Sequence, residues 1–116
     1  MPPDVILALV EAGVVLWVDG DRLRFRAPEM ALDDELRRRA AACRKALVAL
    51  VKSGALLPPD LGSWPPDWRE TLEERAGLMQ FDGGLPKNQA EAEAEARVRL
   101  EYVRRFIERA ALVGSP

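Results

Sequence analysis

Three arginines alternate with apolar residues in the segment RLRFR, at positions 22, 24 and 26, and a tryptophan precedes them at position 17. Side chains two residues apart on a β-strand point to the same face, so Arg22, Arg24 and Arg26 form a row of positive charge. Trp17 can stack on a guanidinium group or on a nucleic-acid base. Such a row can bind an acidic peptide, bind a nucleic acid, or keep an edge strand soluble. The arginines at positions 37 to 39 extend the row only if their helical turn points the same way.

Two acidic clusters, Asp33-Asp34-Glu35 and Glu73-Glu74, are the other residues whose types could carry chemistry. Paired carboxylates can act as acid and base or can hold a cation. Both clusters fall in or near the first turn of an expected helix, where negative charge stabilises the helix dipole. The chain has no histidine, and no serine lies in a nucleophile turn such as G-x-S-x-G. We therefore predict that the protein is not an enzyme and has no catalytic residue, no metal site and no cofactor.

Length and composition limit the kind of protein that can carry these side chains. The chain has 116 residues, of which 48% are apolar and 31% are charged, an ordinary balance for one globular domain. Its net charge of −2 argues against a generally cationic, nucleic-acid-binding surface. A chain this short buries little apolar surface by itself and would bury more in a dimer, so we expect a homodimer. No apolar run is long enough to span a membrane and the start lacks a signal-peptide pattern, so we expect a cytoplasmic protein.

The segment 14–28 is expected to form a β-hairpin, because it is rich in β-branched and aromatic residues and is split by Asp19-Gly20, a dipeptide typical of a type I′ turn. With that turn centre, the apolar face pairs Leu16 with Leu23 and Val14 with Phe25. The opposite face pairs Trp17 with Arg22 and Val15 with Arg24. We expect the apolar face to be buried and the arginines to be exposed.

Helices are expected on both sides of this hairpin. A short helix over residues 4–12 ends at Gly13, and a helical region runs from Asp33, as N-cap, to Gly54. That region forms one helix, or two with a break near Ala41, and its apolar stripe can cover the hairpin. The stripe consists of Leu36, Ala40, Cys43, Leu47 and Leu50. Cys43 is expected to be buried within it.

The rest of the chain is expected to be helical. The proline-rich residues 55–67 read as a linker, and residues 68–113 read as a helical hairpin with its turn at Gly83-Gly84. Trp64 and Trp68 are expected to dock this second half against residues 1–54. The predicted fold class is therefore α+β and mainly helical, with one β-hairpin in residues 1–54 and a helical hairpin at the C-terminal side.

Residues 4–53 also resemble a known family. The segment LWVDGDRLRFRAP, followed by LDDELRRR and CRKALVALV, is similar to the N-terminal docking domain named for TubC, a subunit of the tubulysin megasynthase. The resemblance implies an αββαα fold, often a homodimer, whose exposed hairpin captures a short acidic motif of a preceding synthetase subunit. On this sequence, the partner-binding role falls on Trp17, Arg22, Arg24 and Arg26.

These observations favour a non-catalytic protein docking module that captures a short acidic peptide by strand addition. The alternative is a small nucleic-acid-binding replication accessory factor that uses the same arginine row. The second half, from WPPDWRETLEERAG onward, resembles tails of small bacterial proteins, some of them from phage or plasmid replication regions. That likeness suggests a mobile-element or replication context.

Overall fold

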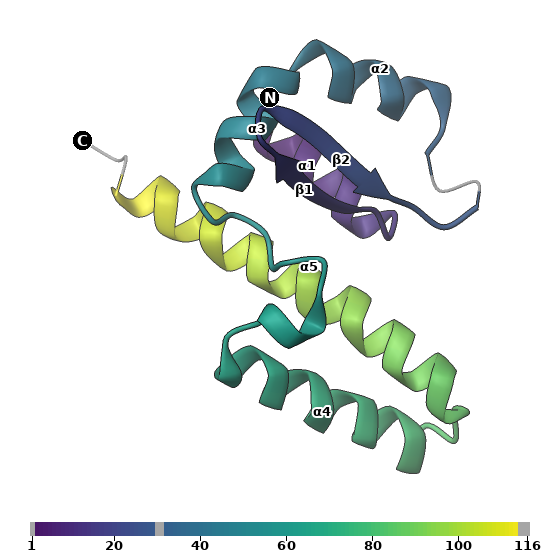
Figure 1. Cartoon of the computed structure of the whole chain (residues 1–116). Coiled ribbons are helices and arrows are strands. Elements are labelled where there is room, and N and C mark those ends of the chain that lie inside the picture. Colours follow the sequence, from purple (N-terminus) through teal and green to yellow (C-terminus); the bar gives the residue numbers. More distant parts are fainter. Residues whose placement is uncertain (1, 30–31, 114–116) are drawn as a thin grey trace.

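The computed structural model describes residues 2–29 and 32–113. Within these ranges the chain forms α1 (Pro2–Glu11), β1 (Val15–Asp19), β2 (Arg22–Arg26), α2 (Asp34–Ala42), α3 (Arg44–Lys52), the 3₁₀ turn η1 (Leu61–Ser63), α4 (Pro66–Phe81) and α5 (Lys87–Val113). This is the predicted α+β, mainly helical fold class. Figure 1 shows the hairpin between α2 and α5, with α4 lying along the far side of α5.

The hairpin is antiparallel, but its register differs from the predicted one. β1 pairs with β2 so that Leu16 lies opposite Phe25 and Trp17 lies opposite Arg24. The turn centre is therefore Gly20-Asp21, one residue later than expected, and Gly20 has a φ of 63° that suits such a turn. Each partner moves by two positions, so every side chain keeps its face.

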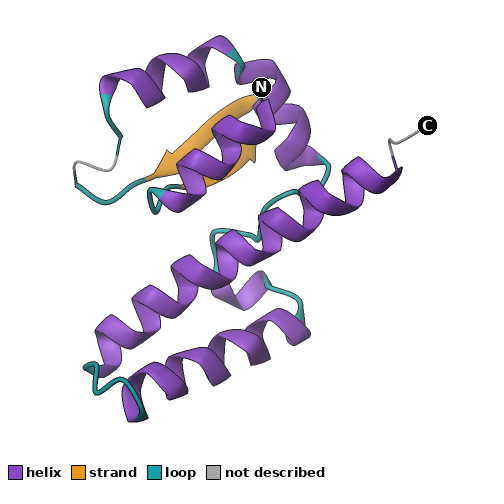
Figure 2. Cartoon of the chain, turned by 180° about the vertical axis from the view of Figure 1, so that it is seen from behind, coloured by secondary structure: helices purple, strands orange, loops and turns teal. Residues whose placement is uncertain are grey.

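One face of the hairpin packs on helices. Val14 and Leu16 are buried and Leu23 is partly buried, and they join a core formed with α1, α2 and α3. Figure 2 shows α1 lying across this face, whereas the opposite face carries no helix in Figure 1. The prediction that Phe25 is buried was wrong, because its side chain is 53% exposed. It stands at the outer edge of β2, beyond the cover that α1 and α3 provide.

The helix ends follow the predicted signals. Gly13 and Gly54 have φ values of 87° and 88°, as expected of residues that follow a helix end. The Asp33 carboxylate accepts a hydrogen bond of 2.7 Å from the Leu36 amide, so it caps α2. The helical region breaks at Cys43, which gives two helices. Cys43 itself is only half buried and donates its thiol to the Arg39 carbonyl.

The main core joins the hairpin unit to α5. Its fully buried members include Ile6 and Leu9 of α1, Leu47 of α3 and Val103 of α5. Leu100, Phe106 and Ile107 of α5 pack against the same cluster. The second half of α5 therefore packs on α1.

A second, smaller core holds α4, α5 and the segment between α3 and α4. It is built from Leu57, Trp64 and Val98, with Trp68, Leu72 and Tyr102 packed around them. Trp68 meets Tyr102 edge to face, with ring centroids 5.1 Å apart. The two tryptophans thus organise this second core. The prediction that they dock the second half of the chain against residues 1–54 was wrong, because α5 makes that contact by packing on α1.

Candidate functional site

The four residues singled out by the sequence lie together on the helix-free face of the hairpin. Trp17 is half buried and faces Arg24 directly across the strands, while Arg22 and Arg26 flank Arg24 on the same face of β2. All three arginines are exposed. Arg24 forms a loose ion pair with Asp19, at 3.7 Å between Nε and Oδ2, in which both side chains remain largely solvated. The hairpin therefore presents an aromatic ring beside a row of guanidinium groups.

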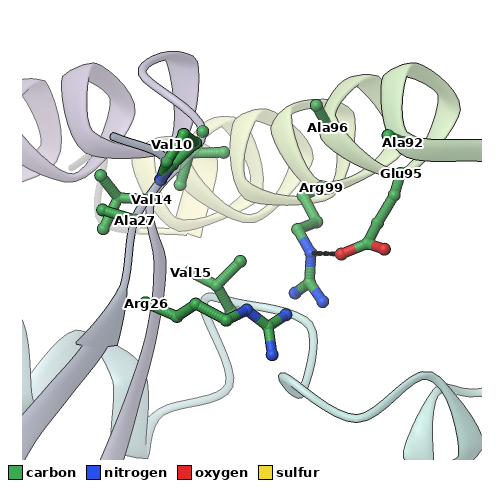
Figure 3. Close-up of a pocket in the computed structure, with 11 residues that line it drawn as sticks. Val10, Val14, Val15, Arg26, Ala27, Ala92, Glu95, Ala96 and Arg99 are labelled. Carbon is green, nitrogen blue, oxygen red and sulfur yellow. Dashed lines mark hydrogen bonds and ion pairs between the residues drawn. The ribbon is translucent and has the colours of Figure 1, made fainter. Parts of the chain in front are cut away.

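Arg26 differs from the other two because it stands near α5. Figure 3 shows its side chain reaching over Val15 toward Arg99 and Glu95. A cavity of about 360 Å³ lies here between the base of the hairpin and α5. Burial lowers the pKa of Arg99, the hydrogen bond and charge of Glu95 raise it, and the charge of Arg26 lowers it further. The base of the hairpin thus brings Arg26 close to the Arg99–Glu95 ion pair of α5.

Arg99 itself has a structural role that the sequence did not reveal. Its side chain is nearly buried and binds Glu95 through Nε at 2.9 Å. Its other nitrogens donate to the carbonyl oxygens of Leu57, Pro58 and Pro59. These bonds fix the segment after α3 against α5. In the sequence the only signal is Glu95 four residues before Arg99, which looks like an ordinary surface pair.

The outer edge of β2 is open. In a two-residue hairpin the pair that flanks the turn exchanges both hydrogen bonds and the following pairs alternate, so Leu23 and Phe25 direct their N–H and C=O groups away from β1. Among the described residues, no backbone hydrogen bond joins β2 to any segment other than β1. These unpaired groups can pair with an added strand.

The start of β1 is partly covered by side chains, although among the described residues β1 also has no backbone hydrogen bond to a segment other than β2. Leu56 and Leu57 lie against Val15 and Leu16, and the space enclosed there together with Arg99 is only about 10 Å³. Figure 1 shows this segment passing between the hairpin and α5. The two edges of the sheet are therefore not equivalent.

A groove runs beside the open edge, between β2 and α2. It has a volume of about 230 Å³, and Leu23 and Phe25 form its hairpin side. Arg37 of α2 and Arg44, the first residue of α3, stand on its other side. Arg37 therefore lies with the apolar face of β2 and does not extend the row of Arg22, Arg24 and Arg26. The sequence did not predict this groove, because the side chain of Phe25 was expected to be buried under the helices.

The tip of the hairpin is tied to α3 by one ion pair. Lys52 Nζ lies 2.9 Å from Asp21 Oδ1, and both groups are exposed. The hydrogen bond from Lys52, and then its charge, lower the pKa of Asp21 below the ordinary value of 3.8. This exposed pair links the hairpin turn to α3.

In residues 2–29 and 32–113, no group of three side chains is arranged to hold a metal ion. No helix in the same ranges is both long enough and apolar enough to cross a bilayer.

The fold and surface define a small αββαα unit, formed by α1 to α3, with an exposed and asymmetric hairpin. Residues 4–52 match the family model described as the TubC N-terminal docking domain. This match confirms the resemblance seen in the sequence and supports a protein–protein docking role for this part of the chain. It includes Trp17 and the three arginines and stops before the segment that leads to α4. No curated protein and no solved structure matches the chain.

Proposed function

We propose that the protein is a non-catalytic docking module that captures a short acidic peptide by strand addition at the outer edge of β2. The observation that carries this proposal is the position of Arg22, Arg24 and Arg26 along a strand whose outer edge is unpaired. Main-chain hydrogen bonds supply affinity in such complexes, and the alternating side chains supply specificity. Trp17 adds an aromatic anchor of the kind that dominates interface energies.

The two faces of β2 favour a particular peptide pattern. In an added strand, side chains alternate between the face with the arginine row and the face with Leu23 and Phe25. Acidic residues would oppose the arginines, and apolar residues would enter the groove beside α2. A segment that alternates acidic and apolar residues therefore fits best.

A second copy of this chain is a poor occupant of the same edge. Antiparallel pairing of two β2 strands around Arg24 would place Arg24 against Arg24 and Arg22 against Arg26. Like charges directly opposite each other destabilise a sheet. We propose that a homodimer forms through α4, where Leu78 is 59% exposed and Phe81 is 83% exposed one turn later.

We further propose the following division of the chain and its setting. Residues 1–54 carry the docking function, residues 55–67 connect, and residues 68–113 form the helical hairpin. The protein acts in the cytoplasm, as part of a mobile element or of its replication. The second candidate function is a replication accessory factor that binds nucleic acid, and it is favoured by the same exposed arginines beside Trp17.

A binding experiment tests the proposal. The probe is a synthetic peptide of alternating glutamate and valine, long enough to pair along β2, and its lysine–valine counterpart is the peptide control. We expect the acidic peptide to bind and Arg24→Glu to weaken it more than tenfold, because like charges then face each other. Arg39→Glu is the matched control, since Arg39 is exposed on α2 and lies outside the groove.

The outcomes separate the two candidates. Equal binding of the acidic peptide to wild type and Arg24→Glu would refute peptide capture at this strand. Binding of single-stranded DNA that is lost in Arg24→Glu, with a steep salt dependence, would support the nucleic-acid function.

A further inference from the structure

The helical hairpin of α4 and α5 carries a groove on the part of the chain that the family match does not include. The groove has a volume of about 590 Å³ and lies between the two helices. Leu61, Leu72 and Ala76 supply apolar surface, and Ala92 faces them from α5. Figure 1 shows that α4 contacts α5 on one side and has no helix on its other sides.

The packing of α4 is thin for a helix of its length. It has 16 residues, and none of them is buried. Leu61, at the end of the groove, remains 39% exposed. Helices in water gain most of their stability by burying an apolar face, so α4 has apolar surface left to cover.

Gly77 leaves open space on the surface of α4 beside the groove. It lies in the interior of α4 among the residues that line the groove, and a Cβ atom placed there would meet no atom within 4 Å. Glycine destabilises a helix interior relative to alanine, and no contact inside the chain requires it at this position. Small residues on a helix surface allow the backbone of another helix to come close.

The charge around the groove indicates the kind of helix. Residues 60–96 contain nine acidic and three basic side chains. Glu73 on α4 and Glu91 on α5 are exposed at the groove together with one basic side chain, Arg69, while Glu95 is already paired with Arg99. The negative potential of this region attracts a basic partner.

From these observations we propose that the α4–α5 groove binds an amphipathic helix of a partner protein, one with small or aliphatic residues on its contact face and lysine or arginine on its flanks. This is the helix-in-groove mode of recognition. The site lies apart from the β2 edge and does not depend on peptide capture there.

The probe for this site is a synthetic amphipathic helical peptide with an alanine–leucine face and lysine flanks. Its counterpart with glutamate flanks is the peptide control. We expect the lysine peptide to bind the full chain and to shift the amide signals of the residues around Gly77 and Ala92. The glutamate peptide should bind at least tenfold more weakly.

Two substitutions locate the site. Gly77→Leu places a side chain in the approach to the groove, and its Cβ would meet no atom of the chain within 4 Å. We therefore expect it to weaken binding of the lysine peptide more than tenfold while the thermal melt shows a folded protein. Glu73→Lys should weaken binding severalfold. Glu74→Lys is its matched control, because Glu74 is the next residue, is exposed and lies outside the groove.

Three results would overturn the proposal. These are equal binding of the lysine and glutamate peptides, equal effects of Glu73→Lys and Glu74→Lys, and signal shifts confined to the β-hairpin. A dimer that persists in Phe81→Asp but that Gly77→Leu converts to a monomer would also overturn it, since a second copy would then occupy the groove. Loss of acidic-peptide capture in Arg24→Glu has no bearing on these measurements.

Discussion

Arg99 and Trp64 bind the same carbonyl oxygen. Arg99 Nη1 donates to the Pro58 carbonyl at 3.1 Å, and Trp64 Nε1 donates to it at 2.8 Å. The guanidinium carbon of Arg99 lies 5.0 Å from the centroid of the Trp64 ring, within the range of a cation–π contact. One side chain of α5 and one of the preceding segment thus converge on a single peptide group. This convergence places Leu56 and Leu57 against β1.

We expect Arg99→Lys to destabilise the protein by about 3 kcal/mol, because lysine cannot reproduce the fork of hydrogen bonds and leaves buried carbonyl groups unpaired. Urea unfolding at neutral pH measures the loss. Arg104→Ala is the matched control on the same helix, since its pair with Glu11 is exposed and should contribute less than about 1 kcal/mol. Equal losses of unfolding free energy in the two variants would show that the hydrogen bonds of Arg99 stabilise the protein no more than an exposed ion pair does.

Leu16→Ala and Phe25→Ala are expected to differ strongly in stability although these residues lie directly opposite each other. Leu16 is 5% exposed, so its truncation should cost about 2 to 5 kcal/mol through lost burial and a cavity. Phe25 is largely solvated, so its truncation should cost about 1 kcal/mol or less. Thermal melts measure both. A cost at Phe25 that matches the cost at Leu16 would contradict the exposed position.

The pKa of Asp21 should lie below 3.8, because Lys52 donates a hydrogen bond and places a positive charge beside it. A lowered folded-state pKa means that the stabilising contribution of the pair is present above 3.8 and disappears as pH falls through the lower folded-state value. Carbon-13 NMR titration of the carboxyl group measures this pKa. Lys52→Ala should raise it toward 3.8, while Lys45→Ala on the same helix should leave it unchanged. An Asp21 pKa that does not respond to Lys52→Ala would contradict the pair in solution.

Sedimentation equilibrium tests the proposed homodimer. Leu47, Val98 and Val103 are fully buried inside the chain, so these apolar side chains are not available for association. We expect a dimer at micromolar concentration and a monomer for Phe81→Asp, since Phe81 is the most exposed large apolar side chain among the described residues. A wild-type monomer at every concentration would remove this proposal.

The sequence predicted the faces of the hairpin but not its register, and the reason is physical. A period of two fixes which side chains share a face, and a shift of both partners by two positions leaves those faces unchanged. Asp19-Gly20 and Gly20-Asp21 both contain the glycine that a tight turn favours. The position of the row formed by Arg22, Arg24 and Arg26 was therefore predictable, whereas the residue opposite Trp17 was not.

The long-range partners of single side chains were not predictable in the same way. Asp33 caps a helix through an amide three residues away, and that local pattern is visible in the sequence. Arg99 binds carbonyl groups about 40 residues away, and carbonyl groups leave no sequence signature. The exposure of Phe25 likewise depends on where α2 passes, which the periodicity of α2 does not specify.

The cover of Leu56 and Leu57 over the start of β1 sets the stoichiometry of the hairpin. A sheet with two free edges can accept a strand on each side, and each added strand can extend the sheet further. Here Leu56 and Leu57 lie against the start of β1, and we expect the stretch that remains to be too short for a second strand to pair stably. We therefore expect the acidic peptide to add at the outer edge of β2 and not at β1, so that its binding isotherm shows one site on each hairpin.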